Sequence, residues 1–317
     1  MATQTANIPR AQPAPGAPTR GAHLWRQMVR YRWGYIFIAP WILVYALFGI
    51  YPLVLSFYLT FFNYSFVRPD DLTFVGVGNW VRGIQDVLFW QSTFNILYNQ
   101  AIFISLTLGL GLMTALLLKQ ITRGGRIFRT IYFLPVVTSV IVLMVIGGYL
   151  TSATGPIQSQ LLRAGIISQP VFWQSTFWLP MPVIAVINSW KWFGVGTVIL
   201  LAGLYSIDPQ LYESASLDGA NGWQLFWSIT IPQLMPQIFF LLVVDFINGL
   251  QMFGEVYAMF DIYGGNQHQA LTPVLYLYAQ AFDQSNMGYA STLGLMLAAL
   301  IALVTILQFR FVPRDVD

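Results

Sequence analysis

The sequence predicts an all-α, polytopic membrane protein with six transmembrane helices, and three observations support that fold class. First, 56% of the 317 residues are hydrophobic and only 9% are charged, whereas soluble domains carry about 25% charged residues. Second, several apolar stretches free of charge are about 20 residues long, which is the length that crosses a bilayer. Third, most Lys and Arg residues fall on one side of those stretches. A soluble enzyme, a disordered chain and a nucleic-acid binder are therefore excluded.

The chain begins with a segment that differs from the rest in composition. Residues 1–30 start with a Pro-, Ala- and Thr-rich stretch that lacks the apolar core of a cleavable signal peptide. We expect a disordered cytosolic segment there, followed by a six-span domain over residues 31–317. The sequence has no cysteine and only two histidines, far apart, so disulfides and zinc sites are excluded. We expect no metal, no cofactor and no catalytic residue in this chain.

The six spans follow from the apolar runs. The first, second, third and sixth are free of charge and cover about residues 35–61, 96–118, 130–150 and 289–309. The fourth, about 183–207, includes Lys191, and the fifth, about 235–259, includes Asp245 and Glu255. Ionisable side chains inside a bilayer are costly and usually functional. The fourth and fifth spans are therefore predicted to carry the functional residues.

The positive charges predict the orientation of these spans. Five Arg residues precede the first span, four Lys or Arg residues separate the second from the third, and two Arg residues follow the sixth. The opposite side holds three, namely Arg68, Arg82 and Arg163. Because positive residues favour the cytosolic side, both termini are predicted to be cytosolic. The same topology puts residues 206–233 in the cytosol, although that loop has no Lys or Arg.

The loop at 206–233 is predicted to form a helix–turn–helix elbow. Asp208 and Pro209 suit the N-cap and first position of a helix, and Gly219 suits its C-terminal end. Asn221 and Gly222 favour a tight turn. A second short helix is expected at 223–230, stopped by Pro232. The alternative is an ordinary loop that rests on lipid headgroups.

This loop resembles a known motif. Glu213-Ser-Ala215, Asp218-Gly219-Ala220 and Ile231-Pro232 resemble the EAA loop of permease subunits from binding-protein-dependent ABC importers, with Ser214 in place of the first alanine. Residues 74–80, 128–135 and 275–289 resemble the carbohydrate branch, which includes the first permease of maltose transporters. The resemblance implies the type I ABC importer permease fold in a prokaryotic cytoplasmic (inner) membrane.

The resemblance also implies partners and coupling residues. It implies a second homologous permease, two ATP-binding subunits that hold ATP and Mg, and an extracytoplasmic solute-binding protein. The residues it implies for contact with the ATPase are Tyr212, Glu213, Ser214, Ala215, Asp218, Gly219 and Ala220. Neither Lys119 nor Lys191 lies in a phosphate-binding G-x-x-x-x-G-K-[ST] loop. We therefore expect ATP hydrolysis in another polypeptide, so that this chain is not itself an enzyme.

A polar stripe is predicted on the fifth span. At 100° per residue, its polar residues fall within an arc of roughly 120°, which should face protein or water rather than lipid. The predicted substrate pathway combines this stripe with the fourth span and consists of Lys191, Trp192, Asp245, Asn248, Gly249, Gln251, Met252 and Glu255. Carboxylates and amides can bind sugar hydroxyls, and aromatic faces can pack on a pyranose ring. The alternative is a polar lock between helices, such as Lys191 with Asp245.

These observations favour the permease subunit of an ATP-driven importer for a di- or oligosaccharide or a related sugar. Two alternatives stay open. One is an ion-coupled secondary carrier in which Asp245 and Glu255 bind the coupling ion. The other is an ABC permease with the same coupling loop for a solute that is not a sugar. The long loop at 151–178 is interpreted either as a contact for a partner protein or as a simple connector.

Overall fold

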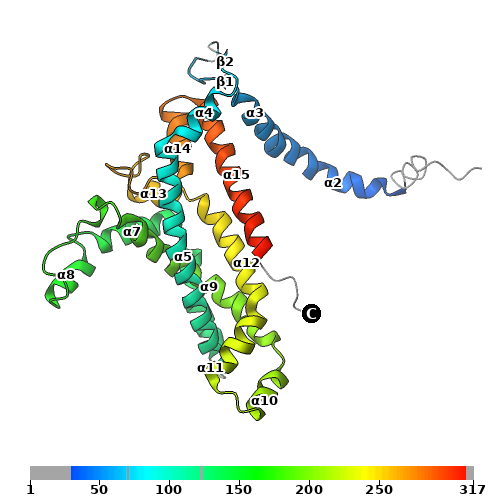
Figure 1. The fold of residues 1–317 in the computed structure, drawn as a ribbon, viewed down its shortest axis with the longest axis vertical. Helices are drawn as coiled ribbons and strands as arrows, with labels where there is room; N and C mark the ends of the chain where they lie inside the picture. Colours follow the sequence, from blue (N-terminus) through cyan, green and yellow to red (C-terminus); the bar gives the residue numbers. More distant parts are fainter. Residues whose placement is uncertain (1–29, 69, 71, 122–123, 312–317) are drawn as a thin grey trace, which may run out of the picture. The chain divides into compact units, whose positions relative to one another are not determined.

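The computed structural model describes residues 30–68, 70, 72–121 and 124–311 (Figure 1). Within those residues the regular secondary structure is helical except for two short antiparallel strands, β1 (Phe62–Asn63) and β2 (Thr73–Phe74). The chain divides into two compact units, Met1–Leu55 and Ser56–Asp317. The segment predicted to be disordered lies outside the described residues as far as residue 29. Its boundary at residue 30 stays a prediction.

The helices of the described part, in chain order, have the following bounds. They are α2 (Arg32–Tyr45), η1 (Ala46–Ile50), α3 (Tyr51–Leu59), α4 (Gly78–Gln85), α5 (Val87–Gln120), α6 (Gly125–Val137), α7 (Val140–Thr151), α8 (Pro156–Arg163), η2 (Trp173–Ser175), α9 (Pro180–Ser206), α10 (Pro209–Leu217), α11 (Gly222–Leu225), η3 (Phe226–Thr230), α12 (Ile231–Leu250), α13 (Gly254–Met259), α14 (Pro273–Tyr278), η4 (Ala279–Asp283) and α15 (Met287–Phe311).

Six helical segments among the described residues are long and apolar enough to cross a membrane. They are Arg32–Leu59, Val87–Gln120, Val140–Arg163, Pro180–Ser206, Gly222–Leu250 and Met287–Arg310. The prediction of an all-α protein with six spans is confirmed. The first of these segments consists of α2, η1 and α3 in succession, and none of its helices buries a side chain within the chain.

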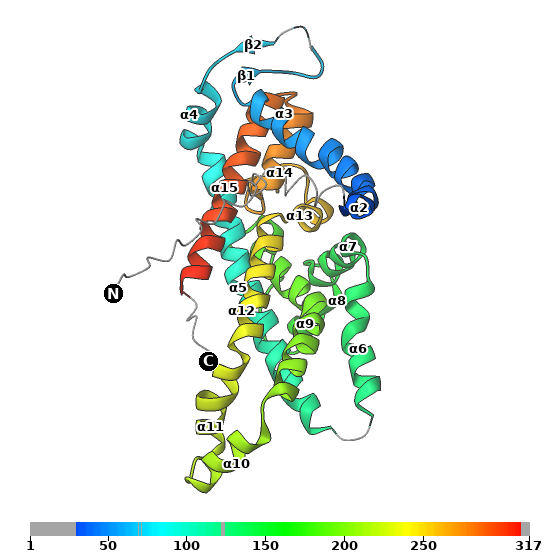
Figure 2. The ribbon, with the colours of Figure 1, turned by 90° about the vertical axis from the view of Figure 1, so that its right-hand side faces the viewer.

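The second unit is built around α5 and α9, which pack side by side along most of their length (Figure 2). Helix α12 packs against both of them, and α6 runs beside α9. The buried apolar side chains form two clusters, one that includes Ile96 and Leu250 and one that includes Leu200 and Leu234. These two clusters fix the relative positions of α5, α9 and α12, which hold the candidate site.

The third predicted span is not one helix. It is divided into α6 and α7, and the backbone is extended at Thr138 and Ser139, with ψ angles of 138° and 131°. Pro135 has no backbone N–H and therefore weakens the last turn of α6. Because α6 ends at Val137, carbonyl oxygens at the break have no helical partner, and those of Pro135, Val136 and Thr138 accept hydrogen bonds from Nζ of Lys191. The continuous helix predicted for residues 130–150 was therefore wrong.

The fifth predicted span also differs from the structure, at both ends. Residues 223–230 do not form a separate helix, because α11, η3 and α12 continue from Gly222 to Leu250. Pro232 does not stop the helix, since the wider π-turn of η3 just before it accommodates a residue without an N–H donor. At the other end, α12 stops at Leu250, and the carbonyl oxygen of Met252 accepts a 2.8 Å hydrogen bond from Thr272 Oγ1. The predicted helix over 235–259 is thus interrupted.

A carboxyl group joins three helices at one end of the second unit. Asp86 is the N-cap of α5, where its Oδ1 accepts hydrogen bonds from the backbone N–H groups of Leu88 and Phe89. Its Oδ2 accepts from the hydroxyl of Tyr276 at 2.6 Å and from that of Tyr289. Burial alone would raise the pKa of Asp86, but these hydrogen bonds outweigh it and hold the pKa below its ordinary value. The ends of α5, α14 and α15 are fastened together in this way.

Candidate functional site

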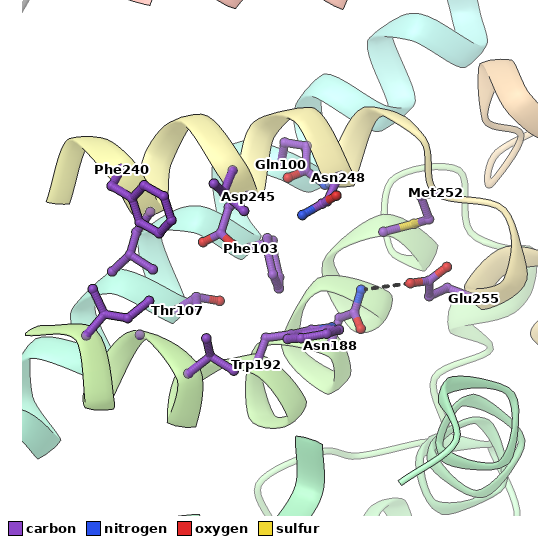
Figure 3. A pocket seen from close by; sticks show the side chains of 16 residues that line it. Gln100, Phe103, Thr107, Asn188, Trp192, Phe240, Asp245, Asn248, Met252 and Glu255 are labelled. Carbon is purple, nitrogen blue, oxygen red and sulfur yellow. Dashed lines mark hydrogen bonds between the residues drawn. The ribbon is translucent and has the colours of Figure 1, made fainter. Parts of the chain in front are cut away.

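A cavity of about 560 Å³ lies between α5, α9, α12 and α13 (Figure 3). This volume is typical of sites for small molecules. Its polar lining residues are Gln100, Thr107, Asn188, Asp245, Asn248 and Glu255, and its larger apolar ones include Phe103, Trp192, Phe240 and Met252. Polar groups and aromatic rings therefore face the same space.

Most of the predicted pathway residues meet in this cavity. The structure places Trp192, Asp245, Asn248, Gly249, Met252 and Glu255 in its lining. Trp192 comes from α9, whereas Asp245, Asn248 and Gly249 come from α12. Met252 and Glu255 reach it across the break between α12 and α13. Their role in carrying a solute stays a prediction.

Gln251 does not line the cavity. It follows the last residue of α12, is exposed, and its amide donates a 2.9 Å hydrogen bond to the carbonyl oxygen of Ile247. The predicted arc assumed that one continuous helix carries residues 245–255. Because α12 ends at Leu250, the direction of each later side chain follows the broken backbone rather than a rotation of 100° per residue.

Lys191 is also outside the cavity lining, although it precedes Trp192. Only 4% of Lys191 is exposed, and its Nζ donates to the carbonyl oxygen of Val136 at 2.8 Å and to two neighbouring carbonyl oxygens. Asp245 Oδ2 is buried and has no hydrogen-bond partner. The lock between Lys191 and Asp245 is therefore not formed in the described structure. Lys191 instead pairs with the backbone at the break between α6 and α7.

Several residues of the cavity were not predicted from the sequence, above all Gln100 and Thr107 of α5 and Asn188 of α9. One signal could have found the first two. They are polar residues seven positions apart in a long uncharged span, so they lie on one face of the helix. Asn188 lies four residues before Trp192 and therefore shares its face of α9. Gln100 and Thr107 were not predicted because only the fourth and fifth spans, which contain ionisable residues, were expected to line the pathway.

Gly249 allows α12 to approach α5 closely at the cavity. A Cβ atom at this position would lie 2.1 Å from the side-chain amide atoms of Gln100. No real contact is that short, so any larger residue would displace the Gln100 amide, which is only 1% exposed. The glycine thus determines where an oxygen acceptor of the cavity lies.

The predicted elbow forms at the end of the second unit where α9 leads into α12, and we define it as residues 208–230 (Figure 2). Asp208 caps α10 by accepting a 2.9 Å hydrogen bond from the backbone N–H of Gln210. Gly219 follows α10 with a φ of +86°, which L-residues rarely adopt. Asn221 caps α11 and forms a reciprocal capping box with Gln224.

The predicted coupling residues differ in exposure. Glu213, Ser214, Asp218 and Gly219 are exposed. Ala215, Asp218, Gly219 and Ala220 line a groove of about 320 Å³ together with residues of α11 and η3. Tyr212 is half-buried instead, with its hydroxyl 3.0 Å from Thr230 Oγ1. We therefore interpret Tyr212 as a support of the elbow rather than a contact residue.

The elbow also exposes large apolar side chains. Leu217 is 89% exposed and Trp223 is 70% exposed. Apolar groups of this size beside carboxylates are typical of a surface that another protein covers.

Comparison with known proteins adds a family and several relatives. A family model described as the binding-protein-dependent transport system inner membrane component matches residues 107–315. The lactose transport system permease protein of Rhizobium radiobacter is 34% identical over 280 residues, which cover 87% of this chain and 92% of that protein. The arabinooligosaccharides transport system permease protein of Halalkalibacterium halodurans is 30% identical over 277 residues, which cover 86% and 85%.

Two further proteins are similar at lower identity. The sn-glycerol-3-phosphate transport system permease protein of Brucella abortus is 28% identical over 295 residues, or 89% of this chain and 95% of that protein. Among solved structures, a bacterial ABC transporter involved in the import of the acidic polysaccharide alginate has a chain that matches with a TM-score of 0.75. That match covers 93% of this chain and 100% of the other at 22% identity, so it shows the fold alone.

Proposed function

The chain belongs to the family of binding-protein-dependent transport system inner membrane components, and from this premise we propose that it is the permease subunit of an ATP-driven importer for a carbohydrate. The cargo passes through the cavity between α5, α9, α12 and α13. The elbow couples the permease to a separate ATPase. Membership of this family favours an importer over the ion-coupled carrier that the sequence left open.

The composition of the cavity lining is the main support for the proposed type of cargo. A sugar presents hydroxyl groups around its rim and C–H groups on the faces of its ring. The cavity presents amides and carboxyl groups together with Trp192 and Phe103, and this combination suits such a molecule. The relatives named for lactose and for arabinooligosaccharides support the same class of cargo.

The elbow supports the proposed coupling. Asp208 caps α10, and Asn221 caps the helical segment that continues from α11 through η3 into α12, so a push on the elbow reaches α12 through a continuous helix. The exposed carboxylates of Glu213 and Asp218 suit basic groups on a partner. We propose that two ATP-binding subunits hold ATP and Mg and perform the hydrolysis, since the sequence contains no phosphate-binding loop.

The remaining partners and the topology belong to the same proposal. A solute-binding protein delivers cargo from outside, as the family description implies. A second homologous permease completes the pathway, as the resemblance of the loop at 206–233 to the EAA loop implies. Both termini are cytosolic, in agreement with the positive charges beside the spans. Residues 31–317 form the permease domain, with the coupling loop at 206–233.

Affinity purification of the tagged chain in mild detergent, followed by mass spectrometry, tests this function. We expect recovery of a second six-span permease and of an ATPase with a phosphate-binding loop. The purified complex should then transport sugar into proteoliposomes with ATP and the binding protein, and not without them. Transport by this chain alone, driven by an ion gradient, would contradict the proposal and would favour the secondary carrier.

A further inference from the structure

We infer that the cavity admits uncharged, hydroxyl-rich cargo and rejects anionic cargo, and that Asp245 is a determinant of this selectivity. The inference rests on the proposed function, because it assumes that cargo occupies the cavity between α5, α9, α12 and α13. Similarity alone does not decide the charge of the cargo. The similar proteins include some named for neutral sugars and some named for glycerol-3-phosphate or an acidic polysaccharide.

Several oxygen atoms of the cavity lining have no hydrogen-bond partner. In the described residues, seven buried side-chain oxygen or nitrogen atoms lack a hydrogen-bond partner. Four of them belong to the cavity lining, namely Gln100 Oε1, Thr107 Oγ1, Asn188 Oδ1 and Asp245 Oδ2. Buried polar groups are normally paired, and leaving one unpaired costs about 1–3 kcal/mol. Because these oxygens are buried, the hydroxyl groups of a cargo reach them only when neighbouring side chains shift, and the new hydrogen bonds then remove that cost.

The amide nitrogens of Gln100 and Asn188 pair with other side chains of the protein. Gln100 Nε2 donates to Asn99 Oδ1, and Asn188 Nδ2 donates to Glu255 Oε1, each at 3.4 Å. These amides thus direct N–H groups to protein partners and leave their carbonyl oxygens without one (Figure 3). The unpaired side-chain oxygens of Gln100 and Asn188 are therefore acceptors, whereas the lining residue Asn248 has an amide nitrogen that can donate. A phosphate or carboxylate, which only accepts hydrogen bonds when fully ionised, would leave the oxygens of Gln100, Asn188 and Asp245 unpaired, although the Thr107 hydroxyl could donate to it.

The ionisable side chains that line the cavity are acidic. Asp245 and Glu255 both line the cavity, and no Lys or Arg occurs among its described lining residues. Lys191 precedes Trp192 in α9, but its Nζ is bound to carbonyl oxygens of residues 135, 136 and 138. Like charges brought together at a desolvated site repel strongly. The carboxyl groups therefore oppose an anion, while a neutral polyol meets no such repulsion.

Matched pairs of ligands test this selectivity. The full chain, purified with the subunits that accompany it and placed in nanodiscs without binding protein, is titrated with lactitol and lactobionate, maltitol and maltobionate, and cellobiitol and cellobionate. The members of each pair differ by a CH₂OH group in place of a carboxylate. We expect the neutral member of at least one pair to bind at least about tenfold more tightly than its anion.

Variants connect the selectivity to the cavity. Asp245→Asn should reduce the preference for the neutral member at least about threefold, because it removes charge and keeps the size of the side chain. Asp70→Asn, at an exposed position in the β1–β2 connection, is the matched control and should leave the preference unchanged. Glu255→Gln should act in the same direction as Asp245→Asn, and it keeps the test decisive if the first variant fails to fold.

Three results would overturn the inference. If an anion binds the unaltered chain as tightly as its neutral partner, the charge selectivity is wrong while the proposed carbohydrate function stands. If the preference exists but neither carboxyl variant changes it, the assignment to this cavity is wrong. If no member of any pair binds, and the complex also fails to transport sugar with its binding protein, the inference falls together with the proposed function.

Discussion

The elbow and the cavity differ in how far along the sequence their contacts reach. In the elbow, Asp208 pairs with Gln210, and Asn221 pairs with Gln224. In the cavity wall, Asn188 pairs with Glu255, which is 67 residues away. Just outside it, Lys191 pairs with Val136, which is 55 residues away. The contacts that cap the elbow helices are local, although Tyr212 and Ile229 of the elbow also pack against the apolar cluster that includes Leu200 and Leu234. Contacts between distant segments hold the cavity together, so the loss of one of them lowers the stability of the whole bundle.

This difference has consequences for mutations in each region. Substitutions at the elbow surface should alter coupling and lower the stability of the chain only by their local cost in backbone strain or capping, about 1–2 kcal/mol. Substitutions at distant contacts around the cavity should alter stability or cargo binding. Four predictions test the separation, in order of decreasing expected effect.

The largest effect is expected for Lys191→Met. The variant removes the ammonium group that binds carbonyl oxygens at the break between α6 and α7. Because an unpaired buried polar group costs about 1–3 kcal/mol, we expect a loss of about 3 kcal/mol in the free energy of unfolding. Thermal unfolding of the detergent-purified chain measures it as a lower Tm.

The control for this prediction is the other lysine of the chain. Lys119 is exposed, and its Nζ lies 5.1 Å from the ring centroid of Tyr212 in the elbow. Lys119→Met should cost less than about 1 kcal/mol, as expected for an exposed cation beside an aromatic ring. Equal losses in the free energy of unfolding of the two variants would show that the long-range contact of Lys191 does not stabilise the bundle more than an exposed lysine does.

The second effect is expected at the elbow for Gly219→Arg. The residue follows α10 with a positive φ and lines the groove with Ala215 and Asp218. A bulky cation there should block docking of the ATPase, so we expect transport to fall at least about 30-fold, or about 2 kcal/mol. ATP hydrolysis should persist without transport, and the free energy of unfolding should fall only by the backbone strain of about 1–2 kcal/mol. Parallel assays of transport and ATPase activity measure the uncoupling.

Gly165→Arg is the matched control for that substitution. Gly165 also has a positive φ, at +68°, and a Cβ atom added there would meet no atom within 4 Å, as at Gly219. It lies between α8 and η2, outside the elbow. We expect a similar strain and normal coupling. Uncoupling by both variants, or by neither, would remove the assignment of docking to the elbow.

The third effect is expected for Gly249→Ala in the cavity. The new methyl group must displace the amide of Gln100, so one acceptor leaves its position. Because a hydrogen bond contributes about 1 kcal/mol, binding of a neutral disaccharide should weaken about five- to tenfold. Gly254→Ala is the control, since its nearest neighbour would be Val140 Cγ1 at an ordinary 3.9 Å. Unchanged binding in Gly249→Ala would show that cargo does not contact Gln100.

The same contrast explains how much the sequence could predict. The elbow was predicted in detail up to Gly222, because Asp208, Pro209 and Gly219 act on their own neighbours. The six spans were predicted because apolar length is also a local property. Pro232 misled the prediction because a π-turn, which has no simple sequence signature, accommodates it.

The cavity could be predicted only in part. Asp245 and Asn248 were found because polar residues in an apolar span stand out, and both line the cavity. Gln251 was misplaced because the end of α12 at Leu250 depends on contacts with a distant segment, such as that between Thr272 and Met252. The seven-residue spacing of Gln100 and Thr107 could have marked their face of α5, but the place of Gln100 beside Gly249 follows from the packing of α5 against α12. Such contacts are not visible in one sequence.

The smallest effect is expected for Asn221→Ala, which removes the capping box of α11. The side chain of Asn221 accepts a hydrogen bond from the backbone N–H of Gln224, and the Gln224 side chain accepts one from the backbone N–H of Asn221. Loss of an N-cap costs about 1 kcal/mol, so amide protection against hydrogen exchange over 222–225 should fall about fivefold. The Tm should stay the same, because these contacts do not reach the bundle, and Asn221→Ser should restore the protection. A lower Tm in Asn221→Ala would mean that the elbow and the bundle unfold as one unit, and the separation between local and distant contacts would then fail.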